Sequence, residues 1–118
     1  MSTITILGAG AMGSALANAM VRAGWTTHLW GTWLDDHLID AIEAGTPHPR
    51  IDVVIDSAVK TFRSDQLDAA LEGAQVVVCS VASVGVPKVF EMALPGIARA
   101  EALWLTSKGF MPLSLIHI

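Results

Sequence analysis

The sequence has little charge and a single cysteine. Only 15% of its 118 residues are charged, and Lys and Arg together number seven. A net charge of −4 and the lack of a basic patch exclude general nucleic-acid binding. Cys79 alone cannot form an internal disulfide, which fits a reducing compartment, so we expect the cytoplasm. The cysteine, the four histidines and the scattered acids have no spacing suited to a metal site.

A basic leader and a long uninterrupted apolar run are also missing. Glycines break the apolar N-terminal segment, which therefore predicts neither a signal peptide nor a membrane span. Hydrophobic residues nevertheless make up 53% of the chain, and the mean hydropathy is +0.54. This balance is typical of one domain built on a buried parallel sheet. It also predicts apolar surface that another domain or another copy covers.

The most informative stretch is ITILGAGAMGSALANAMVRAG, residues 4–24. Residues 4–7 predict a buried strand, and the apolar spacing from Met12 predicts a helix that ends at Gly24. The apolar face of this helix is expected to carry Ala15, Leu16, Ala19, Met20 and Ala23.

Strand, glycine loop and helix in this order form the dinucleotide-binding fingerprint. Gly8 allows the tight turn, Gly10 lets a pyrophosphate approach the backbone, and Gly13 lets the helix pack closely on the strand. The helix N-terminus offers unpaired N–H groups and a partial positive charge to phosphates. A plain structural turn is the alternative, because glycine turns are common. The context favours binding of NAD or NADP.

The rest of the chain alternates strand-like and helix-like segments. Strands are expected at residues 25–31, 59–63, 75–81 and 102–106, with strand-like residues also at 51–55. Helices are expected at residues 34–45, 66–72 and 86–94, the first of them burying Leu34, Leu38, Ile39 and Ile42. We therefore predict an α/β fold, a Rossmann-type doubly wound and mostly parallel sheet of order 3-2-1-4-5.

Residues at the end of the second strand determine whether such proteins bind NAD or NADP. An Asp or Glu there holds the ribose 2′-hydroxyl of NAD, whereas an Arg accommodates the 2′-phosphate of NADP. This chain has Gly31 and Thr32, and Thr32 can hydrogen-bond either cofactor. Asp35 and Asp36 are expected to cap or charge the next helix. The sequence leaves the choice between NAD and NADP open.

Two further segments are expected at the same edge of the sheet. Ala82 and Ser83 follow the fourth strand, next to the first strand at the switch point where ligands bind. Lys108 follows the fifth strand, where its ammonium can stabilise a phosphate or a developing alkoxide. An ordinary solvated lysine is the alternative, but the glycine fingerprint favours the functional role.

Together these residues resemble the N-terminal domain of the NAD(P)-dependent sn-glycerol-3-phosphate dehydrogenase family, over about residues 3–110. The matching segments are GAGAMGSALA at 8–17, LWG at 29–31, the strand at 76–81 with the Val-Ala-Ser at its end, and TSKG at 106–109. The resemblance implies that Ala11 and Met12 lie against the cofactor and that Lys108 reaches both the cofactor and a phosphate substrate. Family members often have a bulky residue at the Met12 position, Pro at the Ala82 position and a basic residue near Thr32.

The resemblance also implies a reaction, namely reversible hydride transfer between NAD(P)H and dihydroxyacetone phosphate to give sn-glycerol 3-phosphate. Family members continue into a helical second domain that supplies the catalytic lysine. We therefore expect an incomplete Rossmann domain at residues 1–110, a tail unlike the family at 111–118, and no catalytic residue in this chain.

None of His28, His37 and His48 is a convincing general base, and each is expected to be structural or solvated. We expect a homo-oligomer that binds its cofactor without appreciable turnover. Two alternatives stay open, a ketopantoate-reductase-like enzyme of the same superfamily and a nucleotide-sensing module without chemistry.

Overall fold

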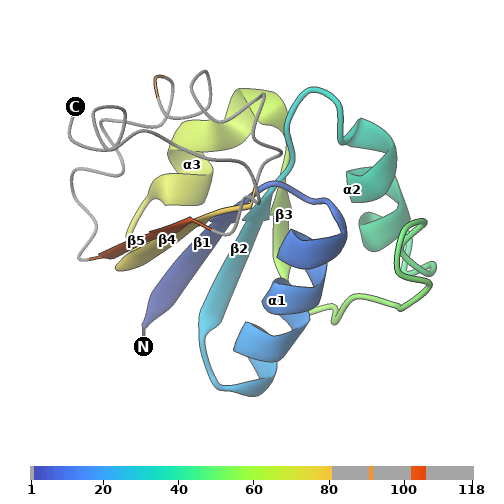
Figure 1. The fold of residues 1–118 in the computed structure, drawn as a ribbon, viewed down its shortest axis with the longest axis horizontal. Coiled ribbons are helices and arrows are strands. Elements are labelled where there is room, and N and C mark those ends of the chain that lie inside the picture. The colour runs from blue at the N-terminus through green and yellow to red at the C-terminus, as the bar shows by residue number, and fades with distance from the viewer. Residues whose placement is uncertain (1, 81–90, 92–101, 106–118) are drawn as a thin grey trace.

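The computed structural model describes residues 2–80, 91 and 102–105, and its centre is a parallel sheet. Within these residues the strands are β1 (Thr3–Leu7), β2 (Thr26–Trp30), β3 (Lys60–Phe62), β4 (Val76–Cys79) and β5 (Ala102–Leu105). The strand pairs are all parallel, and the order is β3-β2-β1-β4-β5 (Figure 1). The predicted Rossmann-type order is confirmed.

Helices cover both faces of this sheet. They are α1 (Ala11–Arg22), α2 (Asp36–Glu43) and α3 (Leu67–Leu71), and the short 3₁₀ helix η1 (Ser64–Gln66) precedes α3. Ile4, Ile6 and Leu29 share one hydrophobic core with residues of α1 and α2. Neighbouring strand residues point to opposite faces. Accordingly Thr5 and His28 point the other way and contact α3.

A polar pair on the sheet holds α3 in place. Thr5 and His28 are partners in the register of β1 and β2. The Thr5 hydroxyl donates to the carbonyl oxygen of Ala70, and Nδ1 of His28 lies 2.9 Å from the same oxygen. Because a carbonyl only accepts, Nδ1 must carry the proton in this contact. His28 is therefore a structural residue, as predicted.

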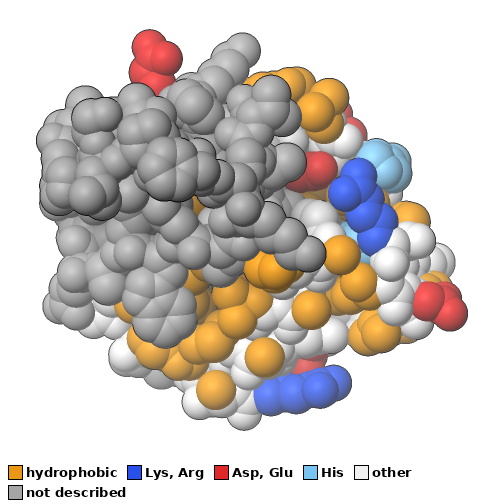
Figure 2. Space-filling model, viewed as in Figure 1, with side chains coloured by type: hydrophobic (Ala, Val, Ile, Leu, Met, Phe, Trp, Pro, Cys, Tyr) orange, Lys and Arg blue, Asp and Glu red, His pale blue; other side chains and the backbone are white. Residues whose placement is uncertain are grey.

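The buried face of α1 differs from the prediction. Its buried residues are Gly13, Ser14, Ala17 and Asn18. Of the predicted apolar face, Leu16 and Met20 are partly buried and pack against the core. The prediction is wrong for the alanines of that face, since Ala15, Ala19 and Ala23 are exposed. Small side chains let the helix approach β1 and β2 closely, and alanine on several sides makes the apolar spacing ambiguous. Figure 2 shows hydrophobic side chains at the surface over α1.

The second helix follows the prediction except at its start. Leu38, Ile39 and Ile42 are buried as predicted. Leu34, however, precedes α2 and is 73% exposed, so its predicted burial is wrong. The helix begins only at Asp36 because residues 32–35 form a turn. In this turn the Asp35 N–H donates to the Thr32 carbonyl at 2.9 Å.

Residues 51–55 were expected to be strand-like, and this expectation is wrong. Asn18 of α1 accepts the N–H of Asp56 at 2.7 Å and donates to the carbonyl of Val54 at 3.5 Å. The carbonyl of Val53 accepts the N–H of His48 at 2.9 Å. Backbone groups that a sheet would need are thus engaged within the loop and with α1.

Several predictions lie outside the described residues. They are the helix at 86–94 apart from the helical Glu91, the candidate residues Ala82, Ser83 and Lys108, and the tail at 111–118. In the part of the chain that is described, no helix is long and apolar enough to cross a membrane; the longest, α1, has 12 residues.

Candidate functional site: the loop at residues 8–13

The glycine loop joins the carboxyl end of β1 to α1. Gly8 has φ = 113°, in the region that glycine adopts readily and other residues rarely do. Its N–H donates to the carbonyl of Trp30, the last residue of β2, at 2.7 Å. The loop therefore lies at the carboxyl edge of the sheet, beside the first two strands. Ligands bind at this edge in doubly wound folds.

Gly13 is required by packing. A Cβ placed on Gly13 would lie 2.1 Å from the carbonyl oxygen of Gly8, and that oxygen belongs to the backbone and cannot swing away. The expected roles of Gly8 in the turn and of Gly13 in close packing are thus both confirmed. Neither role requires a ligand.

Gly10 differs from both, because neither its backbone conformation nor the described residues around it require a glycine. Its φ of −69° and ψ of −169° suit any residue. Among the described residues, a Cβ on Gly10 would meet nothing closer than Nη1 of Arg50, at 3.8 Å. The absent side chain leaves space over the N-terminus of α1. This is the cradle that a phosphate needs and that a Cβ would fill.

The N-terminus of α1 supplies donors to that space. The first intrahelical hydrogen bond runs from the N–H of Ser14 to the carbonyl of Gly10, at 3.0 Å. The N–H groups of Ala11, Met12 and Gly13 precede it and have no intrahelical acceptor. Met12 is 46% exposed in this first turn. The geometry suits an anion, because N–H dipoles and the helix dipole both favour negative charge.

The inner side of the loop is held at Ala9, which is fully buried. Its N–H donates to Oδ2 of Asp35 at 3.2 Å. Its carbonyl oxygen accepts from the Ser14 hydroxyl at 2.9 Å and lies 2.8 Å from Nε2 of His48. Three side chains from three segments therefore hold the two peptide groups on either side of Ala9, which keeps the loop in one shape.

Asp35 does not have the capping role that was expected of it. It occupies the N-cap position of α2, and Asp36 lies in the first turn as expected, but Asp35 makes no side-chain cap hydrogen bond. Oδ2 of Asp35 instead accepts the N–H groups of Ala9, at 3.2 Å, and Thr32, at 3.1 Å. The carboxylate is turned toward the sheet edge because two donors meet it there, and it joins the glycine loop to the end of β2.

Thr32 lies next to this junction. It is 6% exposed, and its Oγ1 accepts the N–H of Leu34 at 3.3 Å. The hydroxyl acts only as an acceptor in this hydrogen bond and does not use its own hydrogen there. The structure therefore brings most of the predicted cofactor residues to one edge of the sheet. These residues are Gly8, Gly10, Ala11, Met12, Gly13 and Thr32.

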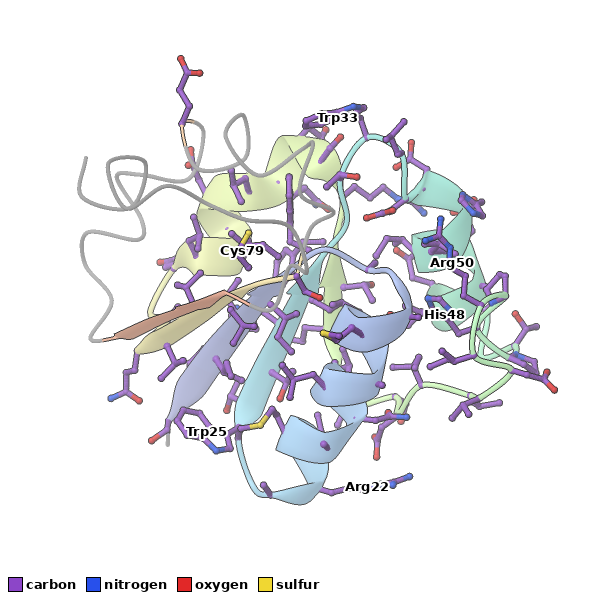
Figure 3. The ribbon with its side chains drawn as sticks, in the orientation of Figure 1. Arg22, Trp25, Trp33, His48, Arg50 and Cys79 are labelled. Atoms are coloured by element: carbon purple, nitrogen blue, oxygen red, sulfur yellow. The ribbon has the colours of Figure 1, made fainter. Side chains whose placement is uncertain are left out.

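Sequence reasoning missed two contacts at this edge. His48 is structural, one of the two roles expected of it, but its contact with the glycine loop was not predicted; it is fully buried and bonded to Ala9. Arg50 was not a candidate at all, yet its guanidinium lies beside Gly10. Figure 3 shows His48 and Arg50 together near the start of α1, whereas Arg22 lies at the other end of that helix. The prolines that flank His48 were a signal of a rigid loop, without indicating where it lies.

A parallel sheet of this order, with a glycine loop that leads into an open helix N-terminus, defines a Rossmann-type domain of the dinucleotide-binding class. The sequence model of the family described as NAD-dependent glycerol-3-phosphate dehydrogenase N-terminus matches residues 3–117. The chain belongs to this family.

Individual relatives agree with this assignment. The NADP(+)-dependent glycerol-3-phosphate dehydrogenase of Archaeoglobus fulgidus is 40% identical over 108 residues, which are 92% of this chain and 32% of the relative. The crystal structure of glycerol-3-phosphate dehydrogenase from Coxiella burnetii has a TM-score of 0.80 at 27% identity, covering 98% of this chain and 36% of that one. The chain thus spans about a third of the length of these relatives.

A putative 2-dehydropantoate 2-reductase from Enterococcus faecalis has a TM-score of 0.74 at 20% identity, covering 99% of this chain and 37% of that one. At this identity the likeness shows a shared fold only. The expected alternative, a ketopantoate-reductase-like enzyme, therefore has less support than the glycerol-3-phosphate dehydrogenase family.

Proposed function

We propose that this chain binds NAD or NADP, with the diphosphate against Gly10 and the N-terminus of α1. The observation that carries the proposal is the space at Gly10, which the packing of the described residues does not require. Ala11 and Met12 would contact the diphosphate side of the cofactor, and Thr32 would face the adenosine ribose. Gly8 and Gly13 shape the loop that holds it.

Three further contacts are proposed from the sequence, at Ala82, Ser83 and Lys108. Lys108 would contact both the cofactor and a phosphate group of the substrate, because a compact ammonium suits a point contact with phosphate. When bound, the nicotinamide ring gives or takes a hydride. The protein's part at this edge is to bind, orient and stabilise charge.

We further propose that, in a protein of the relatives' length, this domain takes part in reversible hydride transfer between NAD(P)H and dihydroxyacetone phosphate, giving sn-glycerol 3-phosphate. Membership in the family supports this reaction, as does the 40% identity to the Archaeoglobus fulgidus enzyme. The substrate would be a small phosphate-bearing molecule, not a nucleic acid.

The chain by itself is proposed to bind without turnover, since hydride transfer also needs a group that gives or takes the hydroxyl proton. His28 and His48 are buried against the carbonyl oxygens of Ala70 and Ala9, and His37 is exposed on α2. A steady-state assay with dihydroxyacetone phosphate and NADPH should detect no turnover. Rates of about 1 s⁻¹ or more, ordinary for enzymes, would contradict this.

The binding proposal is tested by titrating NADPH and NADH into the wild-type chain and into Gly10→Ala. Adding one methyl group where the phosphates would lie should lower the affinity for both nucleotides by roughly tenfold or more, about 1.4 kcal/mol. Ala19→Ser is the matched control, because it adds one atom at an exposed position of the same helix. If Gly10→Ala binds both nucleotides as tightly as the wild type, the phosphates do not lie there.

We also propose a cytoplasmic location and a homo-oligomer. The single cysteine, Cys79, is buried in β4 and suits a reducing compartment. Several large hydrophobic side chains are exposed in the described residues, as expected of a surface that another domain or copy covers. They are Met12, Trp33, Leu34, Val53 and Val54.

A further inference from the structure

We infer that two copies of this chain associate through the groove between the ends of α1 and α2 and the start of β3, with Arg22 of each copy facing Asp56 of the partner subunit. The inference rests on the homo-oligomer proposed above, for which it names the interface, and it does not depend on nucleotide binding. Three observations support it: an apolar groove, two exposed valines beside it, and neighbouring charges of opposite sign that are not paired within the described residues.

The groove has the composition of a protein–protein interface. Its volume is about 910 Å³, and it is open to solvent. Charged residues from the ends of three elements line it, namely Arg22 in the last turn of α1, Glu43 at the end of α2 and Lys60 at the start of β3. Buried apolar side chains lie between them; they are Ile42, Ile55 and Val59. An apolar centre within a charged, solvent-accessible rim is typical of interfaces between proteins.

This groove is separate from the proposed nucleotide site. The glycine loop precedes the first turn of α1, whereas Arg22 is the last residue of that helix, about 16 Å further along its axis. Figure 3 shows Arg22 at the end of α1 that lies away from His48 and Arg50. A partner in the groove would therefore leave the glycine loop accessible.

Two exposed valines precede Ile55 in the loop that borders the groove. Val53 is 45% exposed, and Val54, which lines the groove, is 53% exposed. The carbonyl of Val53 accepts the N–H of His48 at 2.9 Å, and the carbonyl of Val54 accepts from Nδ2 of Asn18 at 3.5 Å. The valines thus belong to a loop whose backbone is bonded on both sides, so they need little ordering when they meet a partner.

The other large exposed hydrophobic side chains lie elsewhere. Met12 is in the first turn of α1, and Trp33 and Leu34 follow β2, at the edge where the nucleotide is proposed to bind. A bound nucleotide would contact that edge and not the groove. The exposure of Val53 and Val54 therefore needs its own explanation, and a second copy provides one.

Charges of both signs line the groove, and they are engaged differently. Glu43 is engaged within the chain, because its Oε1 accepts the Thr61 hydroxyl at 3.3 Å and lies 3.6 Å from Nη2 of Arg63. Arg22 and Asp56, by contrast, form no ion pair with any described residue. One cation and one carboxylate at the groove are therefore available to a partner.

Arg22 and Asp56 come from neighbouring segments. Asn18, one helical turn before Arg22, accepts the N–H of Asp56 through its Oδ1 at 2.7 Å. Within the described residues, the one hydrogen bond of the Asp56 carboxylate comes from the backbone N–H of Ala58, at 2.9 Å. The two opposite charges thus flank the same groove without meeting each other.

Such a patch is complementary to itself. A twofold axis presents the same surface of each copy to the other, so every contact between two different residues occurs twice. Each Arg22 guanidinium can then form two parallel hydrogen bonds with the carboxylate of Asp56 of the partner subunit. The valines of each copy meet the apolar part of the other groove.

The copies meet through side chains and not by extending the sheet. β3 is an edge strand of three residues, and its Lys60 is exposed. Short edge strands that carry lysine are protected against pairing with another strand. The interface therefore lies beside β3, between the ends of the helices.

The test measures the oligomeric state of the full 118-residue chain by sedimentation velocity, with circular dichroism to verify folding. The wild type should form a dimer with a dissociation constant of roughly micromolar order. Arg22→Glu and Asp56→Lys each place like charges together twice, so each should lower the dimer affinity by roughly 100-fold or more. Mixed in equal amounts, the two variants should form a heterodimer, because both charge pairs are then restored. The double variant should again form a homodimer.

Two matched controls separate the groove from the rest of the surface. Val54→Asp should dissociate the dimer, whereas Leu34→Asp, which adds the same charge at an exposed apolar position outside the groove, should not. Asp68→Lys changes charge as Asp56→Lys does, at an exposed position on α3, and should leave the dimer intact.

The outcomes separate the interface from the proposals on which it rests. If the wild type stays monomeric up to its solubility limit, the homo-oligomer and this interface are both overturned, while the proposed nucleotide binding stands. The groove then has a different occupant or none. If the wild type dimerises but Leu34→Asp dissociates it, or the charge reversals do not, only the interface is overturned. Failure of the mixed variants to form a heterodimer would also overturn the pairing of Arg22 with Asp56.

Discussion

The two sides of the glycine loop differ in what holds them. On the inner side, Gly13 meets the carbonyl of Gly8, and Ala9 is held by Ser14, Asp35 and His48 through its own backbone groups. Every feature there has a partner inside the protein. On the outer side, Gly10 has an ordinary backbone conformation, and the described residues leave room there for a side chain. Their packing does not explain why this residue is glycine.

The difference shows which parts of a fingerprint motif report on folding and which on binding. A glycine that the protein needs for its own packing says nothing about a ligand. A glycine without a close steric neighbour in the described part of the chain, at a helix N-terminus, is instead the residue that a bound phosphate would require. The distinction between the two sides would be refuted if substitutions on both sides changed stability by the same amount.

The largest effect is expected from Gly13→Ala. The added Cβ would lie 2.1 Å from a backbone oxygen, so β1 and α1 must separate. We expect a loss of about 4 kcal/mol or more in the free energy of unfolding, or no folded protein. Urea unfolding followed by circular dichroism measures it. Gly10→Ala is the matched control, and equal stability of the two variants would refute the packing argument.

An intermediate effect is expected from Asp35→Ala, which leaves the N–H groups of Ala9 and Thr32 without their acceptor in a buried place. The loss should be about 2–3 kcal/mol in the free energy of unfolding. Asp36→Ala removes the neighbouring, exposed carboxylate, whose contact with Arg63 spans 3.7 Å, and should cost less than about 0.5 kcal/mol. The junction is not structural if the two variants unfold at the same urea concentration.

The smallest effect on stability is expected from Gly10→Ala. Alanine is a poorer N-cap than glycine, but it lowers the entropy of the unfolded chain, and the two effects offset each other to within about 1 kcal/mol. The same variant should nevertheless lose nucleotide affinity, as described above. Thermal unfolding with and without NADPH measures both quantities on one sample. A large loss of stability in the absence of nucleotide would show that the fold itself requires Gly10, as it requires Gly13.

Sequence reasoning succeeded where the signal was local. The strand–glycine–helix segment, the order of the strands and the burial of Leu38, Ile39 and Ile42 were all predicted. It failed where local patterns have two readings. The alanines of α1 form an apolar stripe on the exposed side of the helix. Residues 51–55 have a strand-like sequence, but Asn18 of α1 bonds to the backbone of this segment and of Asp56.

The amino-acid sequence by itself determined the kind of domain, because hydrophobic periodicity and the glycine spacing act over neighbouring residues. Only the tertiary structure decided which polar groups surround the loop. Asp35 lies 26 residues from Ala9, and His48 lies 39 residues from it. Contacts at such separations depend on how the strands and helices pack, and no local pattern encodes them. Packing is also what places Arg50 beside Gly10.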